Sequence, residues 1–209
     1  MLTAIGDVMR ELHGRGWITT RDGNVSLRIK GKSELIITPS GWRKTIIHPE
    51  HLVSIPIGEI SRELEIPEGQ TPSGELHMHW LLLKDAEQTR SVVHAHPTHI
   101  IAAMYRGFDL PTICDQFPEI YRYTRVGPSV PVLPAVSKEL GDATALAHGI
   151  DSGGDVEFDV VGQGAHGVCA VGGSPWEAFE HIERLNHICE IVLASGVSPA
   201  TAHDNDVEA

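Results

Sequence analysis

Three histidines, at two places in the chain, have the type and spacing that bind metal ions. His94 and His96 lie two residues apart in the segment Val92-Val93-His94-Ala95-His96-Pro97, and His166 lies in the glycine-rich run 162–167. Residues two apart on a strand share a face, so His94 and His96 would project side by side. Three imidazoles with one open position are the usual composition of a catalytic zinc site. In the alternative, His94 and His96 are core histidines bonded to backbone groups, and His166 is an ordinary loop residue.

A carboxylate with possible chemistry lies in the segment 71–79, where Pro-Ser-Gly interrupts the chain and begins a helix. The sequence predicts Glu75 in the first turn of that helix, where free backbone N–H groups attract anions. Glu75 is therefore a candidate fourth metal ligand and a candidate general base, and its default role is to satisfy the helix dipole. His79 lies one turn further along the same face and could orient Glu75.

Two polar glycine loops, 21–24 and 38–41, each adjoin a strand of a predicted hairpin. With the 71–79 segment they offer backbone amides, hydroxyl groups and an amide side chain, which together can form an anion site. The candidate donors are Asn24, Ser40, Gly41, Ser73 and Gly74. Arg21, Arg43 and Lys44 could add positive charge. The alternative is ordinary turn chemistry, in which Gly, Asn and Ser are expected.

The elements that must position these residues mix helices with strands. The hydrophobic periodicity predicts a first helix that begins at Leu2 and ends near Gly14 or Gly16, and further helices over 74–84, 98–105 and 138–148. A last helix follows the capping box Ser174-Pro175-Trp176-Glu177. Strands are predicted over 24–29, 34–38, 52–57, 130–133, 156–161 and 167–171. Residues 58–72 are read as a hairpin or loop, and 107–131 as an irregular loop with a strand fragment. This pattern predicts a mixed or antiparallel sheet covered by helices.

Length and composition narrow the class of protein. The 209 residues fit one domain over 1–197 better than two, followed by a polar tail over 198–209. The net charge of -12 argues against nucleic acid or an anionic membrane as partner. No run approaches the roughly 18 apolar residues of a membrane span, and the first residues do not resemble a signal peptide. Three widely spaced cysteines suggest reduced thiols and a cytoplasmic protein.

Several of these segments occur in an order that resembles the class II aldolase/adducin family. The segments are Gly23-Asn24-Val25-Ser26, Ile37-Thr38-Pro39-Ser40-Gly41, Pro72-Ser73-Gly74-Glu75 with His79, His94-Ala95-His96 with His99, and His166-Gly167 before an acidic-aromatic helix. The resemblance covers residues 3–195, nearly the whole chain. The ordered set is far more specific than any single segment.

The resemblance implies an α/β fold, a three-layer α/β/α sandwich with a largely antiparallel central sheet. It implies a zinc ion, with Mn²⁺ or Co²⁺ as alternatives, held by His94, His96 and His166. Glu75 would be a fourth ligand or the acid/base. The phosphate of the substrate would lie against the loop donors at 24, 40–41 and 73–74. The family commonly forms homotetramers with active sites between subunits.

The activity that the resemblance implies is that of a metal-dependent aldolase, a carbon–carbon lyase of carbohydrate metabolism. Such an enzyme cleaves a ketose 1-phosphate, or a similar small hydroxy-ketone, to dihydroxyacetone phosphate and an aldehyde through an enediolate. Glu75 favours an aldolase or a ketose-phosphate dehydratase, because epimerase-like members carry aspartate there. The alternatives are a dehydratase or decarboxylase on the same scaffold, and a non-enzymatic, adducin-like interaction module.

The chain also departs from the family pattern. Arg21 stands where the aldolases have a small hydroxyl residue, and it could bind a phosphate or a carboxylate. Gly74 replaces a second serine, which removes a hydroxyl group and keeps the N–H. The family's aldolases also use one tyrosine from a neighbouring subunit and another on the C-terminal tail. The tail here has no tyrosine, and in the loop at 107–131 the candidate proton donors are Asp115, Tyr121 and Tyr123.

Overall fold

A six-stranded sheet forms the centre of the computed structural model, which describes residues 1–57 and 63–197. Its strand order is β3-β2-β1-β4-β6-β5, and every neighbouring pair is antiparallel. The strands are β1 (Asn24–Arg28), β2 (Glu34–Ile37), β3 (Val53–Pro56), β4 (Arg90–Ala95), β5 (Val160–Gln163) and β6 (Gly167–Gly172). The predicted hairpin of the first two strands is confirmed, with Ser26 opposite Ile37.

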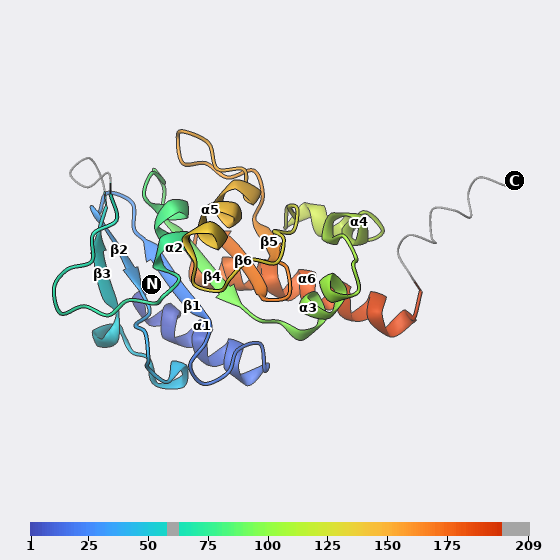
Figure 1. Cartoon of the computed structure of the whole chain (residues 1–209), viewed down its shortest axis with the longest axis horizontal. Coiled ribbons are helices and arrows are strands. Elements are labelled where there is room, and N and C mark those ends of the chain that lie inside the picture. The colour runs from blue at the N-terminus through green and yellow to red at the C-terminus, as the bar shows by residue number, and fades with distance from the viewer. Residues whose placement is uncertain (58–62, 198–209) are drawn as a thin grey trace, which may run out of the picture.

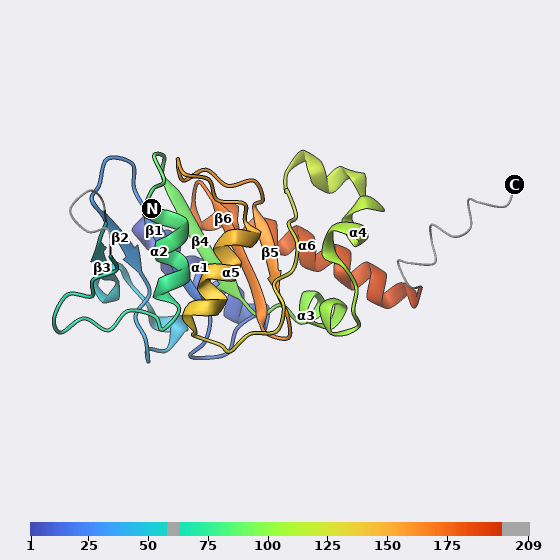
Figure 2. The ribbon, with the colours of Figure 1, turned by 45° about the horizontal axis from the view of Figure 1, so that its top comes forward.

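Helices cover both faces of the sheet. They are α1 (Leu2–Gly14), α2 (Leu76–Leu83), α3 (Thr98–Tyr105), α4 (Leu110–Asp115), α5 (Lys138–Ala147) and α6 (Pro175–Ser195). Figures 1 and 2 show α2 and α5 on one face of the strands, with α1 and α6 on the other. The three-layer α/β/α sandwich with an antiparallel sheet is therefore confirmed.

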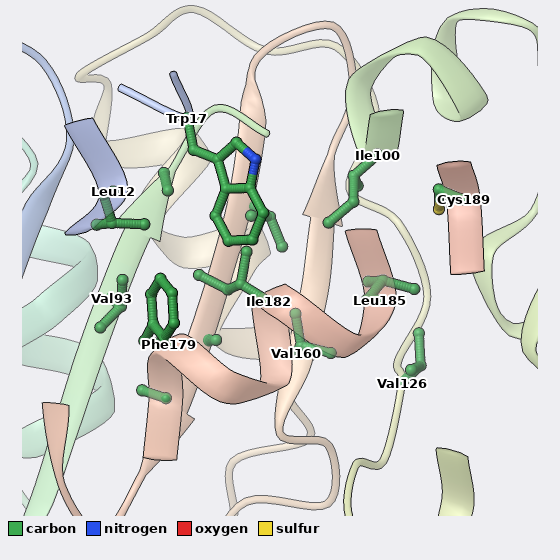
Figure 3. Close-up of a cluster of buried hydrophobic side chains, with 14 of the residues drawn as sticks. Leu12, Trp17, Val93, Ile100, Val126, Val160, Phe179, Ile182, Leu185 and Cys189 are labelled. Atoms are coloured by element: carbon green, nitrogen blue, oxygen red, sulfur yellow. The ribbon is translucent and has the colours of Figure 1, made fainter. Parts of the chain in front are cut away.

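Two hydrophobic cores follow from the alternation of side chains along the strands. In β4, Val93 and Ala95 belong to the core under α1, α3 and α6, whereas Val92 belongs to the core under α2 and α5. Trp17 and Phe179 stack in the first core with their ring centroids 5.7 Å apart (Figure 3). The central strands are therefore packed against helices on both faces of the sheet, which fixes the position of the histidine-bearing end of β4.

The last helix begins where the capping signal predicts. Ser174 Oγ accepts a hydrogen bond from Glu177 N at 3.1 Å, and Pro175 occupies the first helical position. The Glu177 carboxylate accepts from Gly173 N at 2.7 Å, one residue before the position that a full capping box would use. The helix ends at Gly196, whose φ of 70° is left-handed.

Two predictions about secondary structure were wrong. Residues 107–131 are not simply irregular, because they contain α4 and a short 3₁₀ helix at Pro118–Arg122. Two of their four prolines, Pro111 and Pro118, stand at helix starts, and Asp109 caps α4 by accepting from Thr112 N at 3.0 Å. No strand forms over 130–133, where only Val130 makes an isolated bridge, to Gln163. The strand predicted over 156–161 begins at Val160.

Parts of two other sequence interpretations lie outside the described residues. These are 58–62, within the predicted hairpin or loop, and the predicted tail at 198–209. Across the described residues, no helix is both long and apolar enough to cross a membrane.

Candidate metal centre

The three predicted metal ligands meet at one end of the sheet, where β4 ends and the turn between β5 and β6 lies beside it. His94 is paired with Asn24 on one side and Cys169 on the other. His96 follows β4, and its backbone N–H donates to Trp17 O at 2.7 Å. His166 belongs to the turn before β6. The candidate ligand atoms of the three histidines lie within 4.8 Å of one another.

The hydrogen bonds of these histidines fit a metal ion. His94 Nδ1 donates to the carbonyl oxygen of Val168 at 3.1 Å, so in the neutral ring Nε2 carries a lone pair. That atom lies 2.9 Å from His96 Nε2. Burial lowers the pKa of His96 to about 4 and also lowers that of His166, so both rings are neutral at neutral pH. Neutral imidazoles with converging lone pairs are the form that binds a divalent cation.

Glu75 lies directly against this triad. Its Oε2 is 3.2 Å from His94 Nε2, and its Oε1 is 3.7 Å from His166 Nε2. Burial opposes ionisation of this carboxyl, but His94, the Asn24 hydrogen bond and His166 outweigh it and lower the pKa of Glu75. The residue occupies the N-cap position of α2 instead of its first turn, with φ -91° and ψ 16°, and its side chain makes no capping hydrogen bond. An ionised carboxylate here can either bind the metal or accept a proton from a substrate.

A buried network fixes the orientation of Glu75. Asn24 Nδ2 donates to Glu75 Oε2 at 2.7 Å, and Asn24 Oδ1 accepts from His79 Nε2. His79 Nδ1 then accepts from Ser26 Oγ at 2.6 Å. Burial lowers the pKa of His79 to about 3, so the ring stays neutral. His79 thus orients Glu75 as the sequence suggested, but through Asn24, and Ser26 is a member that the sequence interpretation missed.

A cavity of about 430 Å³ opens beside the triad. Its walls include both glycine loops and the turn before α2. The lining residues are Arg21, Asp22, Gly23, Asn24, Ser40, Lys44, Ser73, Gly74, Glu75, His96, Ala135, Val136 and His166. Of the predicted anion-site residues, Gly41 and Arg43 are not among them. Asp22, which the sequence interpretation did not single out, lies 3.7 Å from His96 Nδ1 and accepts from Thr19 Oγ1 at 2.8 Å.

The profile of the "Class II Aldolase and Adducin N-terminal domain" matches residues 3–193. The chain belongs to this family. Members of this family are typically dependent on divalent metals, and His94, His96 and His166 form a group that is suited to hold such an ion.

Three proteins that are similar to the chain carry different activities in their names. A methylthioribulose-1-phosphate dehydratase of Pectobacterium atrosepticum is 25% identical over 206 residues, covering 91% of this chain and 93% of that one. A 3-oxo-tetronate 4-phosphate decarboxylase of Escherichia coli is 26% identical over 186 residues, covering 88% and 82%. The L-fuculose-1-phosphate aldolase of Thermus thermophilus shares the fold, with a TM-score of 0.67, 24% identity and 93% coverage of both chains.

The predicted proton donors, Asp115, Tyr121 and Tyr123, do not lie beside the three histidines of the same chain. Tyr121 Oη donates to Asp115 Oδ1 at 2.5 Å, between α4 and the 3₁₀ helix that follows it. Burial and the neighbouring Asp115 raise the pKa of Tyr121. Tyr123 packs against the guanidinium groups of Arg122 and Arg184. None of the three lines the cavity, so one chain does not bring them to the histidines.

Gly167 allows β6 to approach the metal centre closely, and we expect Gly167→Ala to disturb it. A Cβ there would meet Ala95 O and would lie 2.7 Å from His96 Cδ2 and 3.1 Å from His94 Cε1. Overpacking of this kind costs about 1–3 kcal/mol of unfolding free energy, and moving two ligands should weaken metal binding. Thermal unfolding and metal titration measure both effects.

The matched control is Gly14→Ala at the end of α1, where an added Cβ meets nothing within 4 Å. It should leave metal affinity unchanged and hold or raise the melting temperature. Equal metal affinity and stability in the Gly167 and Gly14 variants would contradict the close-approach role of Gly167.

Proposed function

We propose that this protein is a metal-dependent lyase that cleaves a ketose 1-phosphate, or a similar small hydroxy-ketone, to dihydroxyacetone phosphate and an aldehyde. The proposal rests on the way three histidines and the Glu75 carboxylate meet at the wall of one cavity. His94 Nε2 lies within 4 Å of both His96 Nε2 and Glu75 Oε2, and His166 Nε2 lies within 4 Å of Glu75 Oε1. Zinc suits three imidazoles with an open position, and Mn²⁺ or Co²⁺ are the alternatives.

The residues of the site account for the steps of this cleavage. A divalent cation held by the triad would polarise the substrate ketone and stabilise the negative charge that develops on it. Glu75 accepts the proton of the hydroxyl on carbon 4 while the bond between carbons 3 and 4 breaks. The electron pair of that bond passes toward the ketone, and the aldehyde leaves. Glu75 then returns the proton to carbon 3, so one carboxyl group serves both proton transfers.

The cavity offers one carboxylate, Glu75, that can act as a general base, and this favours carbon–carbon cleavage over dehydration. Two carboxylates line the cavity within the described chain, Asp22 and Glu75. Asp22 is bonded to Thr19 and faces His96, so its role is to orient a ligand. Retro-aldol cleavage needs one proton acceptor that can return its proton, whereas dehydration needs a base for the carbon acid and an acid for the leaving hydroxyl.

Dehydration is the second candidate, because relatives named as dehydratases match more than nine tenths of the chain. The extra acid would then come from a second subunit. We infer that the working form is a homotetramer with active sites between subunits, in which Tyr121 or Asp115 reaches a neighbouring site. The three free, buried cysteines support a cytoplasmic setting.

Product identification tests the proposal and separates its two forms. Metal-loaded protein is incubated with fuculose, ribulose and methylthioribulose 1-phosphates, and the products are identified by mass spectrometry. We expect dihydroxyacetone phosphate and an aldehyde in equal amounts, lost on chelation. A diketone phosphate, one water lighter than its substrate, would replace the aldolase proposal by dehydration. Absence of any product from fully metal-loaded protein would reject both.

A further inference from the structure

Val136 has a backbone conformation that valine rarely adopts. Its φ is 63°, in the left-handed region, where a β-branched side chain clashes with the backbone. It is the third residue of the turn 134–137, which the backbone N–H of Ser137 closes by donating to Pro134 O at 3.4 Å. Turns with a positive φ at this position favour glycine. A valine here is therefore strained, and strain of this kind clusters at functional sites.

The surrounding chain holds Val136 in this conformation. Ser137 Oγ accepts a hydrogen bond from Leu140 N at 3.0 Å, and so it caps α5 directly after the turn. Pro134 has a fixed φ at the start of the turn. The strain persists because a proline on one side and a helix cap on the other determine where Val136 lies.

The side chain of Val136 takes the space beside Gly74. A Cβ on Gly74 would lie 2.8 Å from Val136 Cγ1, and its three nearest atoms beyond the adjoining residues would all belong to Val136. Gly74 does not have a positive φ, so the valine and not the backbone excludes a side chain there. Gly74 directly precedes Glu75, whose carboxylate lies against His94 and His166. Val136 therefore covers the turn that carries the candidate base.

Val136 is also an apolar boundary of the cavity beside the triad. Its side chain is 59% exposed and lines that cavity, together with Ala135, whereas the other lining residues are polar, charged or glycine. It lines as well a narrow pocket of about 10 Å³ between α2 and α5, which shares Gly74 and Glu75 with the cavity. The isopropyl group at this boundary limits the space next to Glu75.

We propose that Val136 is a specificity residue that restricts the part of the substrate next to Glu75 to a compact, unbranched group. This inference rests on the proposed function only for the reaction that the substrate undergoes. Glycine at this position would remove the strain, but it would also open the cavity toward the pocket between α2 and α5. The valine therefore provides a steric boundary against larger substrates that glycine could not provide.

The first test is whether Val136 excludes larger ligands. Metal-loaded full-length protein is titrated by calorimetry with acetohydroxamate and with trimethylacetohydroxamate. Both bind a divalent cation through two oxygens, and the second differs only by three added methyl groups. We expect the wild type to prefer acetohydroxamate, and Val136→Gly to reduce that preference about tenfold or more, since a single methylene group changes discrimination by about 10- to 200-fold.

Val132→Gly is the matched control for this measurement. Val132 is 72% exposed in the same loop and does not line the cavity. Its replacement should leave the preference between the two hydroxamates within about twofold of the wild-type value.

The second test measures the contact with Gly74 by thermal unfolding. Gly74→Ala should lower the melting temperature, because its Cβ meets Val136. The double variant Gly74→Ala/Val136→Gly should regain the lost stability, because the two substitutions act on one contact. Val136→Gly alone should melt at or above the temperature of Val132→Gly, because only the first of these relieves strain.

An unchanged ratio of the two hydroxamate affinities in folded Val136→Gly would overturn the proposal, as would a wild type that binds both equally or a Gly74→Ala protein that Val136→Gly does not rescue. If Val136→Gly does not fold, Val136→Ala also shortens the side chain and should reduce the preference. Neither test requires turnover. Both therefore stand even if no tested sugar phosphate is cleaved, and a failure here leaves the proposed lyase chemistry untouched.

Discussion

Replacing His166 by alanine is expected to release the metal ion and to reduce kcat/KM on the order of 10³-fold, as loss of several kcal/mol of charge stabilisation implies. His166 is the best ligand to remove because it lies in a turn with a partly exposed side chain. Its Nδ1 has no hydrogen-bond partner in the described chain, so its loss leaves no new orphaned group. Elemental analysis of the purified variant gives the metal content directly.

The matched control is His187→Ala on α6, whose side chain is 71% exposed and pairs only with Glu190 at 3.8 Å among the described residues. It should keep one equivalent of metal and the wild-type rate. Chelation of the wild type should reproduce the His166→Ala rate, and added Zn²⁺, Mn²⁺ or Co²⁺ should restore it. A His166→Ala protein that retains full metal content would show that these imidazoles do not form the metal centre.

The triad could be predicted because its signals are local. The β-branched residues before His94 indicate a strand, and strand geometry places His96 on the same face. The glycines around His166 indicate a close backbone approach, which Gly167 provides against Ala95 and His96. Only the meeting of the two segments is non-local, and it follows from the β4–β6 pairing, in which His94 lies opposite Cys169.

The network behind Glu75 could not be predicted from sequence. Asn24 and Glu75 are 51 residues apart, and Ser26 and His79 are 53 apart. Their contacts depend on where α2 packs across β1, which no local pattern specifies. The sequence indicated Asn24 as an anion donor, but its amide nitrogen donates to Glu75 and its oxygen accepts from His79. The second hydrogen of that amide nitrogen is the one that remains for the anion that the sequence predicts.

Two further features could not be predicted from the sequence, the burial of Lys44 and the helix α4. Nothing local distinguishes Lys44 from an exposed lysine, because its burial depends on the loop at 38–41 folding over it. The helix α4 was missed because prolines were read as loop signals. Pro111 lies within the first turn of α4, where the missing N–H costs no helical hydrogen bond.

Replacing Glu75 by glutamine is expected to lower kcat by about 10²- to 10⁴-fold, the usual contribution of a general acid–base group. Glutamine has nearly the same shape, and its amide oxygen can still accept from Asn24 Nδ2. It cannot take a proton at neutral pH. The measurement is steady-state kinetics on the ketose phosphate that the product screen identifies, together with the metal content of each protein.

Glu190→Gln is the matched control for this substitution, because Glu190 is an exposed glutamate on α6 whose one ion pair among the described residues is with His187. It should change neither rate nor metal content. In Glu75→Gln, a lost rate with metal retained assigns Glu75 to proton transfer, whereas loss of both assigns it to the coordination sphere. Wild-type kcat in Glu75→Gln would exclude both roles, because an amide at this position can neither hold the proton nor replace the charge of the carboxylate.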